Sequence, residues 1–331
     1  MTMRTFALAL FFVGCNKPNV SPVASSLDAN VPRESVDATG PLPTPTPAPT
    51  QEAKFVARRH DAGAAITIAA VGDISDTSIG AQKRTSDLIY NKGFNAVLLL
   101  GDNQYLSGTT QDYETYFSPT WGRFKALLRP TPGNHEYFTP GATGYFAYFG
   151  MQAGDPSKGY YSYDLGNWHL IALNTNSSCR TVGCDAASAQ VAWLKDDLAQ
   201  SKKKCTIAYW HHPLFNSGAQ HGSFKGATAL WETLYAADAD VVLNGHEHIY
   251  ERFDPQTPTG ELNAQRGIRE FIVGTGGIGF YELGASKPNS VVRQASAYGV
   301  LKLTLNADSY DWEFLAVTPS TFTDKGSGTC H

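Results

Sequence analysis

Polar residues recur directly after apolar runs, at five places along the sequence. These places are "AAVGD" (69–73), "VLLLGD" (97–102), "TPGNHEY" (131–137), "TIAYWHH" (206–212) and "VVLNGHEH" (241–248). The aliphatic runs predict buried β-strands. Ligands of open α/β sheets bind outside the carboxyl ends of the strands. We therefore expect the polar groups to meet at one sheet edge.

The order of the other predicted elements indicates one α/β domain. A helix predicted at 80–93 joins the first two strands, and this strand–helix–strand unit favours a parallel pair. Residues 185–201 have the pattern of an amphipathic helix, and 299–317 that of a β-hairpin. We expect the domain to span 64–320, with a short C-terminal tail at 321–331.

Residues 1–15 have the pattern of a secretory signal, in which Arg4 precedes an apolar run too short to span a bilayer. The end of this run, "FVGC", resembles a bacterial lipobox, whose cysteine becomes a lipidated N-terminus; an ordinary secretory signal is the alternative. Residues 16–63 are predicted to be a disordered Pro/Thr-rich linker. We expect an exported, bacterial lipoprotein-like protein of the cell envelope or periplasm, or an extracellular one. If Cys15 is lipidated, it anchors the chain in the membrane.

The four cysteines after Cys15 suggest two disulfides in an exported chain. Three pairings are possible. The short loop "CRTVGC" favours Cys179–Cys184, which leaves Cys205–Cys330 to tie the C-terminal tail to a core strand. A zinc site is the alternative, although the spacing is not that of a zinc motif.

The charge balance argues against one class of partner. The chain has 26 basic and 30 acidic residues, a formal net charge of -4. Non-specific nucleic-acid binding needs a basic surface, so no nucleic-acid-binding surface is expected. A small anionic substrate remains compatible, because a local cluster of metals or histidines can attract it.

The strand-to-loop junctions also concentrate the histidines. Six of the nine fall in or beside them, namely His135, His211, His212, His221, His246 and His248. Converging carboxylates, imidazoles and an amide suit divalent or trivalent first-row metals. The set is too large for one metal with an open position and fits two metals that share a carboxylate. Such pairs suit in-line displacement at phosphorus.

The ordered segments "GDIS", "GDNQY", "GNHE", "WHHP" and "GHEH" resemble the five blocks of the calcineurin-like metallophosphoesterases, over roughly 66–280. Two details are similar to purple acid phosphatases: Tyr105 stands three residues after Asp102, and "GHEH" continues as "IYER". The resemblance implies an α/β fold of the metallophosphatase β-sandwich type, with two mixed sheets flanked by helices in four layers, α/β/β/α.

The resemblance also implies the metal ligands. A ferric ion would be held by Asp73, Asp102, Tyr105 and His248. A divalent ion (Zn, Fe or Mn) would be held by Asp102, Asn134, His211 and His246, with Asp102 bridging. Ser75 stands where many members of the superfamily have a histidine, and Tyr105 supplies the replacement donor. Taken singly, the two aspartates could instead be helix N-caps, and Tyr105 could pack against its loop.

The other histidines of the junctions match no ligand position. His135 and His221 resemble the family's substrate-facing histidines, which bind phosphate or protonate the leaving oxygen. His212 is interpreted as a substrate-facing residue or as a support for the ligands. The segment "GTGGIG" (274–279) lacks the Lys and Ser/Thr of a P-loop, so it is interpreted as a tight turn.

Together these features predict an exported phosphatase with two metals that acts on small phosphate monoesters. A metal-held water or hydroxide would attack phosphorus in line. A phosphodiesterase or nucleotidase with the same metals is the first alternative. A lipoprotein that binds phosphate or metal without catalysis is the second, but the complete ligand set argues against it.

Overall fold

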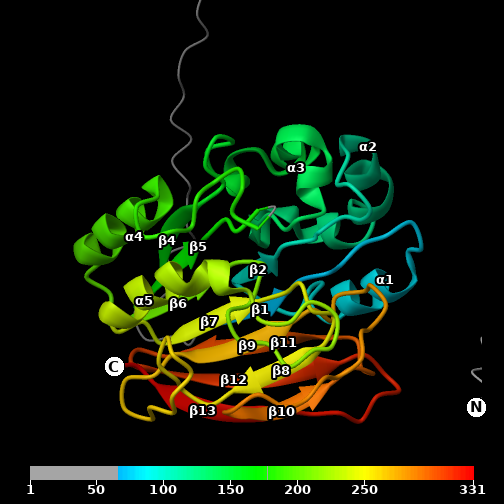
Figure 1. The fold of residues 1–331 in the computed structure, drawn as a ribbon. Helices are drawn as coiled ribbons and strands as arrows, with labels where there is room; N and C mark the ends of the chain where they lie inside the picture. Colours follow the sequence, from blue (N-terminus) through cyan, green and yellow to red (C-terminus); the bar gives the residue numbers. More distant parts are fainter. Residues whose placement is uncertain (1–65, 177) are drawn as a thin grey trace, which may run out of the picture. The chain divides into compact units, whose positions relative to one another are not determined.

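The computed structural model describes residues 66–176 and 178–331 and contains two β-sheets (Figure 1). The predicted signal, Cys15 and the predicted linker at 16–63 lie outside the described residues. The six-stranded sheet has the order β13-β12-β11-β1-β2-β3. Its strands are β1 (Ile66–Val71), β2 (Ala96–Leu100), β3 (Leu128–Thr131), β11 (Gly299–Leu305), β12 (Ser309–Ala316) and β13 (Lys325–Thr329).

The seven-stranded sheet has the order β10-β8-β9-β7-β6-β5-β4. Its strands are β4 (Tyr161–Leu165), β5 (Trp168–Ala172), β6 (Cys205–Tyr209), β7 (Val241–Asn244), β8 (Tyr250–Phe253), β9 (Arg269–Val273) and β10 (Ser290–Gln294). Both sheets are mixed. Strands β1, β2 and β3 are parallel, as are β5, β6, β7 and β9, whereas the other pairs are antiparallel.

Helices flank both sheets, as predicted. The α-helices are α1 (Gly80–Asp87), α2 (Thr110–Asp112), α3 (Thr143–Phe149), α4 (Ala189–Gln200) and α5 (Thr228–Ala236). A π-helical turn follows α2 at Tyr113–Phe117, and 3-10 turns lie at Trp121–Leu127, Glu136–Phe138, Pro140–Ala142, Gly150–Ala153 and Lys225–Ala227. The predicted fold class, two mixed sheets with flanking helices, is confirmed. Among the described residues, no helix is both long and apolar enough to cross a membrane.

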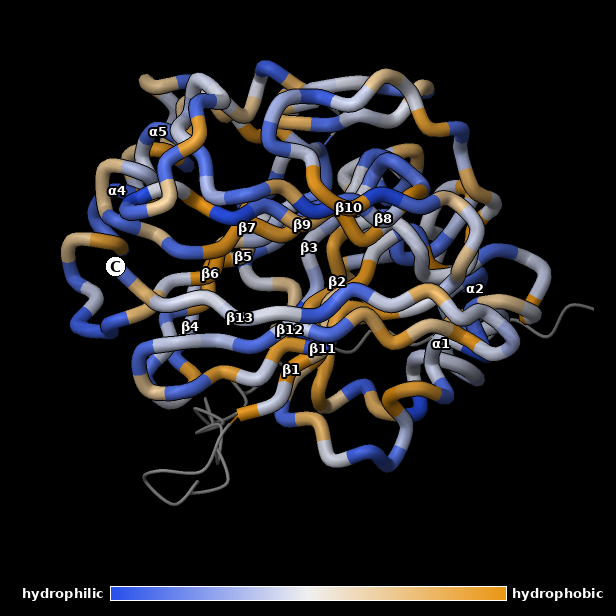
Figure 2. Tube along the Cα trace, turned by 90° about the horizontal axis from the view of Figure 1, so that it is seen from below, coloured by the Kyte–Doolittle hydropathy of each residue, from blue (hydrophilic) through white to orange (hydrophobic). Residues whose placement is uncertain are grey.

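Two apolar clusters account for these layers. One cluster fills the space between the sheets and continues onto the other face of the six-stranded sheet. It includes all five residues of β2, which is apolar throughout because both of its faces are covered. The second cluster joins the seven-stranded sheet to α4 and α5, through residues such as Leu194, Trp231 and Val242. Figure 2 shows the most hydrophobic residues gathered along the strands in the middle of the molecule.

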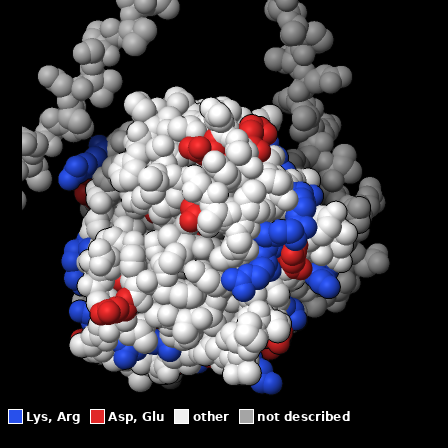
Figure 3. Space-filling model, turned by 90° about the vertical axis from the view of Figure 1, so that its right-hand side faces the viewer, with Lys and Arg blue, Asp and Glu red and all other residues white. Residues whose placement is uncertain are grey.

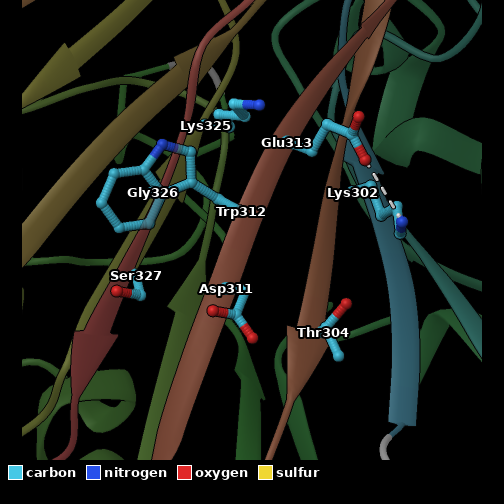
Figure 4. A pocket seen from close by; sticks show the side chains of 8 residues that line it. All are labelled: Lys302, Thr304, Asp311, Trp312, Glu313, Lys325, Gly326 and Ser327. Atoms are coloured by element: carbon cyan, nitrogen blue, oxygen red, sulfur yellow. Dashed lines mark hydrogen bonds and ion pairs between the residues drawn. The ribbon is translucent and has the colours of Figure 1, made fainter.

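The C-terminal hairpin is confirmed as β11 and β12, which pair in antiparallel register. The expected tail at 321–331 contains β13, which pairs with β12 and so extends the six-stranded sheet. On the outer face of these three strands lies a depression of about 540 Å³, lined by short polar side chains such as Thr304 and Ser327 and by the ion pair of Lys302 with Glu313 (Figure 4). None of the candidate site residues lines it.

Both predicted disulfides, Cys179–Cys184 and Cys205–Cys330, are present. They use all four cysteines of the described residues, so the alternative of a zinc site is wrong. The second disulfide joins the first residue of β6 to the residue directly after β13. The end of the chain is thus fixed to a central strand of the other sheet.

Candidate metal centre

The structure brings the five predicted strand-to-loop junctions together. Asp73, Asp102, His211 and His246 each stand two residues beyond the last residue of β1, β2, β6 and β7, respectively. Possible ligand atoms of Asp73, Asp102 and His211 all lie within 4.8 Å of one another, and so do those of His211, His212 and His246. The two groups share His211, whose Nε2 lies 3.1 Å from Oδ2 of Asp102.

Tyr105 joins the two aspartates of the first group to His248. Its hydroxyl is 2.9 Å from Oδ1 of Asp73, 3.0 Å from Oδ2 of Asp102 and 3.1 Å from Nε2 of His248. These four side chains therefore point at one small volume. All four are nearly or completely buried, so water cannot satisfy the two carboxylates from every side.

The second group consists mainly of imidazoles. Nε2 of His211 lies 3.2 Å from Nδ1 of His246, and the ring of His212 lies 4.3 Å from that of His246. The ring of His221 stacks on that of His246, with 4.1 Å between the ring centroids. Burial, together with the charges of neighbouring histidines, lowers the pKa values of His212 and His246 well below their ordinary value.

Asn134 and His135 complete the centre from the loop after β3. The backbone N–H of His135 donates to Oδ1 of Asp102 at 2.8 Å, and its ring Nε2 lies 3.9 Å from the other oxygen of that carboxylate. The side-chain oxygen of Asn134 is buried and has no hydrogen-bond partner. A buried acceptor without a donor is costly, and a cation would satisfy it.

Three of the predicted ligands have a left-handed backbone. The φ angles of Asp73, Asp102 and His246 are +58°, +47° and +71°. Such conformations cost on the order of 1–3 kcal/mol each and gather at functional sites. Glycine permits the close packing around them: a Cβ on Gly133 would lie 2.1 Å from Oδ1 of Asp102.

Backbone carbonyls orient the histidine rings. Nδ1 of His211 lies 2.8 Å from the carbonyl oxygen of Leu100, and Nδ1 of His248 lies 2.8 Å from that of Gly279. In both rings, Nε2 is thereby left to face the centre, which is the arrangement of a metal-ligating histidine. Gly279 belongs to the predicted tight turn at 274–279, which thus helps to position a ligand.

Two buried glutamates hold the loops. Glu136 accepts hydrogen bonds from the backbone N–H groups of Asp102, Asn103, Gln104 and Gly133 and from the hydroxyl of Tyr113. Glu247, between the two histidines of "GHEH", points away from them. It accepts hydrogen bonds from the side chain of Asn216 and the backbone N–H groups of Gln220 and His221. Glu136 therefore supports the loops after β2 and β3, and Glu247 supports the loop that carries His221.

The charges of the centre favour a bound cation. Within the described part of the chain, the carboxylates of Asp73 and Asp102 receive hydrogen bonds and ion pairs from tyrosine, histidine and backbone groups, and none from Lys or Arg. Burial opposes protonation of His211, yet the neighbouring Asp102 raises the pKa of His211 to about 9. Burial and the two carboxylates raise the pKa of Tyr105 well above its ordinary value. A metal bound here has to displace protons from both residues.

This donor set fits two metal ions. Carboxylate, phenol, amide and imidazole donors converge, an amide oxygen lacks a partner, and Asp102 lies between the two groups. His212 is held from behind, since its Nδ1 lies 2.8 Å from the hydroxyl of Thr175. The structure thus places all ten predicted site residues around one centre.

Sequence reasoning missed two residues here. The ring of Tyr281 stacks on that of His248 at 3.9 Å and lies 5.3 Å from that of His221. Thr175 contacts His212 as described above. Tyr281 follows "GTGGIG" in a loop without a regular pattern, so only its position near a Gly-rich segment could have drawn attention. Thr175 ends an apolar run, which is the same signal that marked the other junctions.

The family model described as calcineurin-like phosphoesterase matches residues 66–250, and the chain belongs to this family. Its relatives point to the purple acid phosphatase-like subgroup. The chain is 32% identical to purple acid phosphatase 15 of Arabidopsis thaliana over 223 residues, which are 56% of this chain and 40% of that protein. It is 29% identical to acid phosphatase type 7 of Homo sapiens over 229 residues, which are 61% of this chain and 50% of that protein.

A solved structure agrees in fold. The purple acid phosphatase PPD1 from yellow lupin (Lupinus luteus) seeds superimposes with a TM-score of 0.69, at 18% identity, over 81% of this chain and 54% of that one. At this identity, the likeness shows the fold alone. The chain spans 40% to 50% of the length of the two curated relatives described above.

Proposed function

We propose that the protein is an exported phosphatase with two metal ions that hydrolyses phosphate monoesters. The observation that carries the proposal is the position of the Tyr105 hydroxyl, within 3.1 Å of donor atoms of Asp73, Asp102 and His248. A tyrosine at this place distinguishes a purple acid phosphatase-like centre from one with Asp-x-His at the first junction. The names of the relatives support the same reading.

The donor types support different ions on the two sides of Asp102. Asp73 and Tyr105 offer anionic oxygen donors, which suit a ferric ion, whereas His211 and His246 offer imidazoles, which suit Zn, Fe or Mn in the divalent state. Tyr105 has to lose its proton to act as a tyrosinate. When bound, the two metals lower the pKa of a water and stabilise negative charge on the phosphate oxygens.

The remaining histidines have the roles of substrate contacts. His135 and His221 flank the centre, with exposed fractions of 21% and 33% for their side chains, so a substrate can reach them. They would donate hydrogen bonds to the phosphate, and one of them would protonate the leaving alcohol oxygen. His212 is buried behind His246 and supports the ring positions of the ligands.

Export rests on the disulfides and the sequence pattern of residues 1–15. Disulfides form and persist in oxidising compartments, and this chain has two of them. Lipidation of Cys15 is the further proposal. Mass spectrometry of the mature N-terminus tests it: a diacylglycerol adduct on Cys15 supports a lipoprotein, and an unmodified N-terminus after a cleavage elsewhere contradicts it.

The test of the function combines metal analysis, absorption and a substrate panel. We expect two metals per chain, iron among them, and a visible tyrosinate–iron band that disappears in Tyr105→Phe. We also expect faster hydrolysis of 4-nitrophenyl phosphate than of bis(4-nitrophenyl) phosphate. The reverse preference would establish a phosphodiesterase, and full metal occupancy without turnover of either compound would establish a binding protein.

A further inference from the structure

Two large apolar side chains stand exposed next to His135. The exposed fraction is 73% for Leu106 and 60% for Phe138. Single exposed apolar residues are common on protein surfaces and need no explanation. These two differ because they come from separate loops that both adjoin the same substrate-facing histidine. The ring of Phe138 packs on that of His135, and the backbone carbonyl oxygen of Leu106 lies 2.6 Å from Nδ1 of that histidine. We call Leu106 and Phe138 the apolar rim.

Contacts between aromatic rings connect the apolar rim to the metal centre. The ring of His135 lies 4.1 Å from that of Tyr105 on one side and 4.7 Å from that of Phe138 on the other. The contact with Phe138 is edge-to-face, a favourable geometry for aromatic pairs. Phe138 is therefore one ring beyond the histidine that faces the phosphate position.

Hydrogen bonds hold the two loops of the apolar rim together. Nδ1 of His135 lies 2.6 Å from the carbonyl oxygen of Leu106, and the hydroxyl of Thr139 donates to the carbonyl oxygen of Ser107 at 2.6 Å. The loops at 105–108 and 135–139 are thus linked at two points. The apolar rim is a built feature of the site and does not consist of two independent loop tips.

The surroundings of the apolar rim offer little to a charged group. The segments 103–111 and 132–144 contain no Lys or Arg, and their one carboxylate, that of Glu136, is buried and occupied by backbone donors. Figure 3 shows the side of the molecule that carries α1, where uncharged residues cover most of the surface and a group of Lys and Arg side chains lies to the right of its centre. A substrate group next to the rim finds apolar contacts and no ion-pair partner among these residues other than His135.

We propose that the apolar rim binds the alcohol part of the substrate, so that the preferred substrates are phosphate monoesters of apolar alkyl or aryl alcohols. The proposal rests on the proposed phosphatase function. With the phosphate between the metals and His135, the ester oxygen can direct its substituent toward Leu106 and Phe138. Contact with these side chains removes apolar surface from water on both partners. Esters of polar alcohols such as glycerol lack this contact.

The experiment compares n-hexyl phosphate with glycerol 1-phosphate, two esters of aliphatic alcohols. We expect the native protein to have the higher kcat/KM for n-hexyl phosphate. In the double variant Leu106→Ser/Phe138→Ser, the ratio of the two kcat/KM values should fall about tenfold, the scale of small differences in apolar contact. The conservative variant Leu106→Met/Phe138→Leu should keep the ratio.

Leu262→Ser is the matched control. Leu262 has an exposed fraction of 61% and lies in the loop before β9, whereas the metal centre lies beyond the other end of that strand. The control should keep both kcat/KM values. Inhibition by inorganic phosphate should be equal in all variants, which shows that the metal centre is intact. If the double variant does not fold, Leu106→Ser alone serves in its place.

The outcomes separate the two proposals. Hydrolysis of both esters with equal efficiency by the native protein overturns the apolar rim as a substrate contact and leaves the phosphatase function standing. An unchanged ratio in Leu106→Ser/Phe138→Ser does the same. If the native protein hydrolyses none of the three compounds (the two esters and 4-nitrophenyl phosphate), the phosphatase function is overturned, and this inference with it.

Discussion

The metal centre has two halves that differ in chemistry. The oxygen-donor half comprises Asp73 and Tyr105 with His248, whereas the nitrogen-donor half comprises His211 and His246 with Asn134; Asp102 lies between them. In the first half, three donors surround one phenol oxygen within 3.1 Å. In the second, imidazoles lie close together beside Asp102, and Asp73 accepts a hydrogen bond from the backbone N–H of His246. One edge of the fold thus presents a set of hard oxygen donors next to a set of borderline nitrogen donors.

The C-terminal segment supports both halves from behind. Asp324 accepts hydrogen bonds from Tyr250 at 2.7 Å and from Arg252 at 2.8 Å, and so fixes β8, which begins two residues after His248. The disulfide Cys205–Cys330 fixes β6, which leads to His211. Each half thus depends on a different contact of the last residues of the chain. Substitution of Asp324 or of the disulfide cysteines can therefore perturb one half without changing a predicted ligand.

The largest effect is expected for the residue that the halves share. Asp102→Ala should remove both metals and lower kcat/KM at least about 10³-fold, which corresponds to about 4 kcal/mol of transition-state stabilisation. Metal analysis and initial rates measure it. Asp311→Ala, at an exposed position of β12, is the control and should retain metals and activity. One metal retained at full occupancy in Asp102→Ala would contradict the bridging role.

The next pair of variants tests whether the halves are separable. His246→Ala should lose the divalent ion and keep the visible band, because its ligand set includes neither Tyr105 nor Asp73. Tyr105→Phe should lose the band and keep the divalent ion. Both should lower activity about 10²-fold or more, on the scale of losing one preorganised polar group. If each variant lost both ions together, the halves would be a single cooperative site.

The two disulfides differ in the chain length that they close. Their separations are 125 residues for Cys205–Cys330 and 5 residues for Cys179–Cys184. In the chain-entropy model, their removal costs about 5 and about 2 kcal/mol, respectively. Cys205→Ser/Cys330→Ser should therefore lower the free energy of unfolding in urea more than Cys179→Ser/Cys184→Ser does. It should also weaken the nitrogen-donor half first, because β6 leads to His211. Equal loss from both halves would argue against this.

The smallest expected effect is on the free energy of unfolding and comes from His169, which belongs to neither half. A change at this residue should alter stability without altering metal binding. His169 on β5 lies 2.9 Å from both Asp164 and Asp197. Burial opposes its protonation, but the hydrogen bonds and charges of the aspartates raise the pKa of His169 above its ordinary value. Its contribution to stability is complete below pH about 6.5 and is lost as the pH rises through the raised pKa.

Unfolding experiments across pH 6 to 9 should show this loss. The control His169→Gln should have a lower free energy of unfolding than the native protein at low pH. Its free energy of unfolding should also change less with pH, since glutamine carries no titrating group. An unchanged slope in His169→Gln would assign the dependence to other groups.

Regular patterns carried most of the fold prediction. Apolar runs predicted β1, β2, β6 and β7, because a strand covered on both faces leaves an apolar signature. The segments that form β3 and β10 were not assigned, since "LRPT" is short and contains Pro and "SVVRQ" is a partly exposed edge strand. The tail beyond 320 looked separate because "KGSGT" has no apolar residue, although glycine there packs over Trp312.

The position of polar residues just after apolar runs was enough to predict that these side chains lie at one edge of the fold. Ligand types recur after strands, and strand ends of a parallel sheet share one edge. Only the tertiary structure decided what lies around that centre. Tyr281 on His248, Thr175 on His212, Asp324 on Arg252 and the exposed pair Leu106 and Phe138 are contacts between distant segments. Such contacts depend on loop conformation and packing, which leave no periodic trace in the chain.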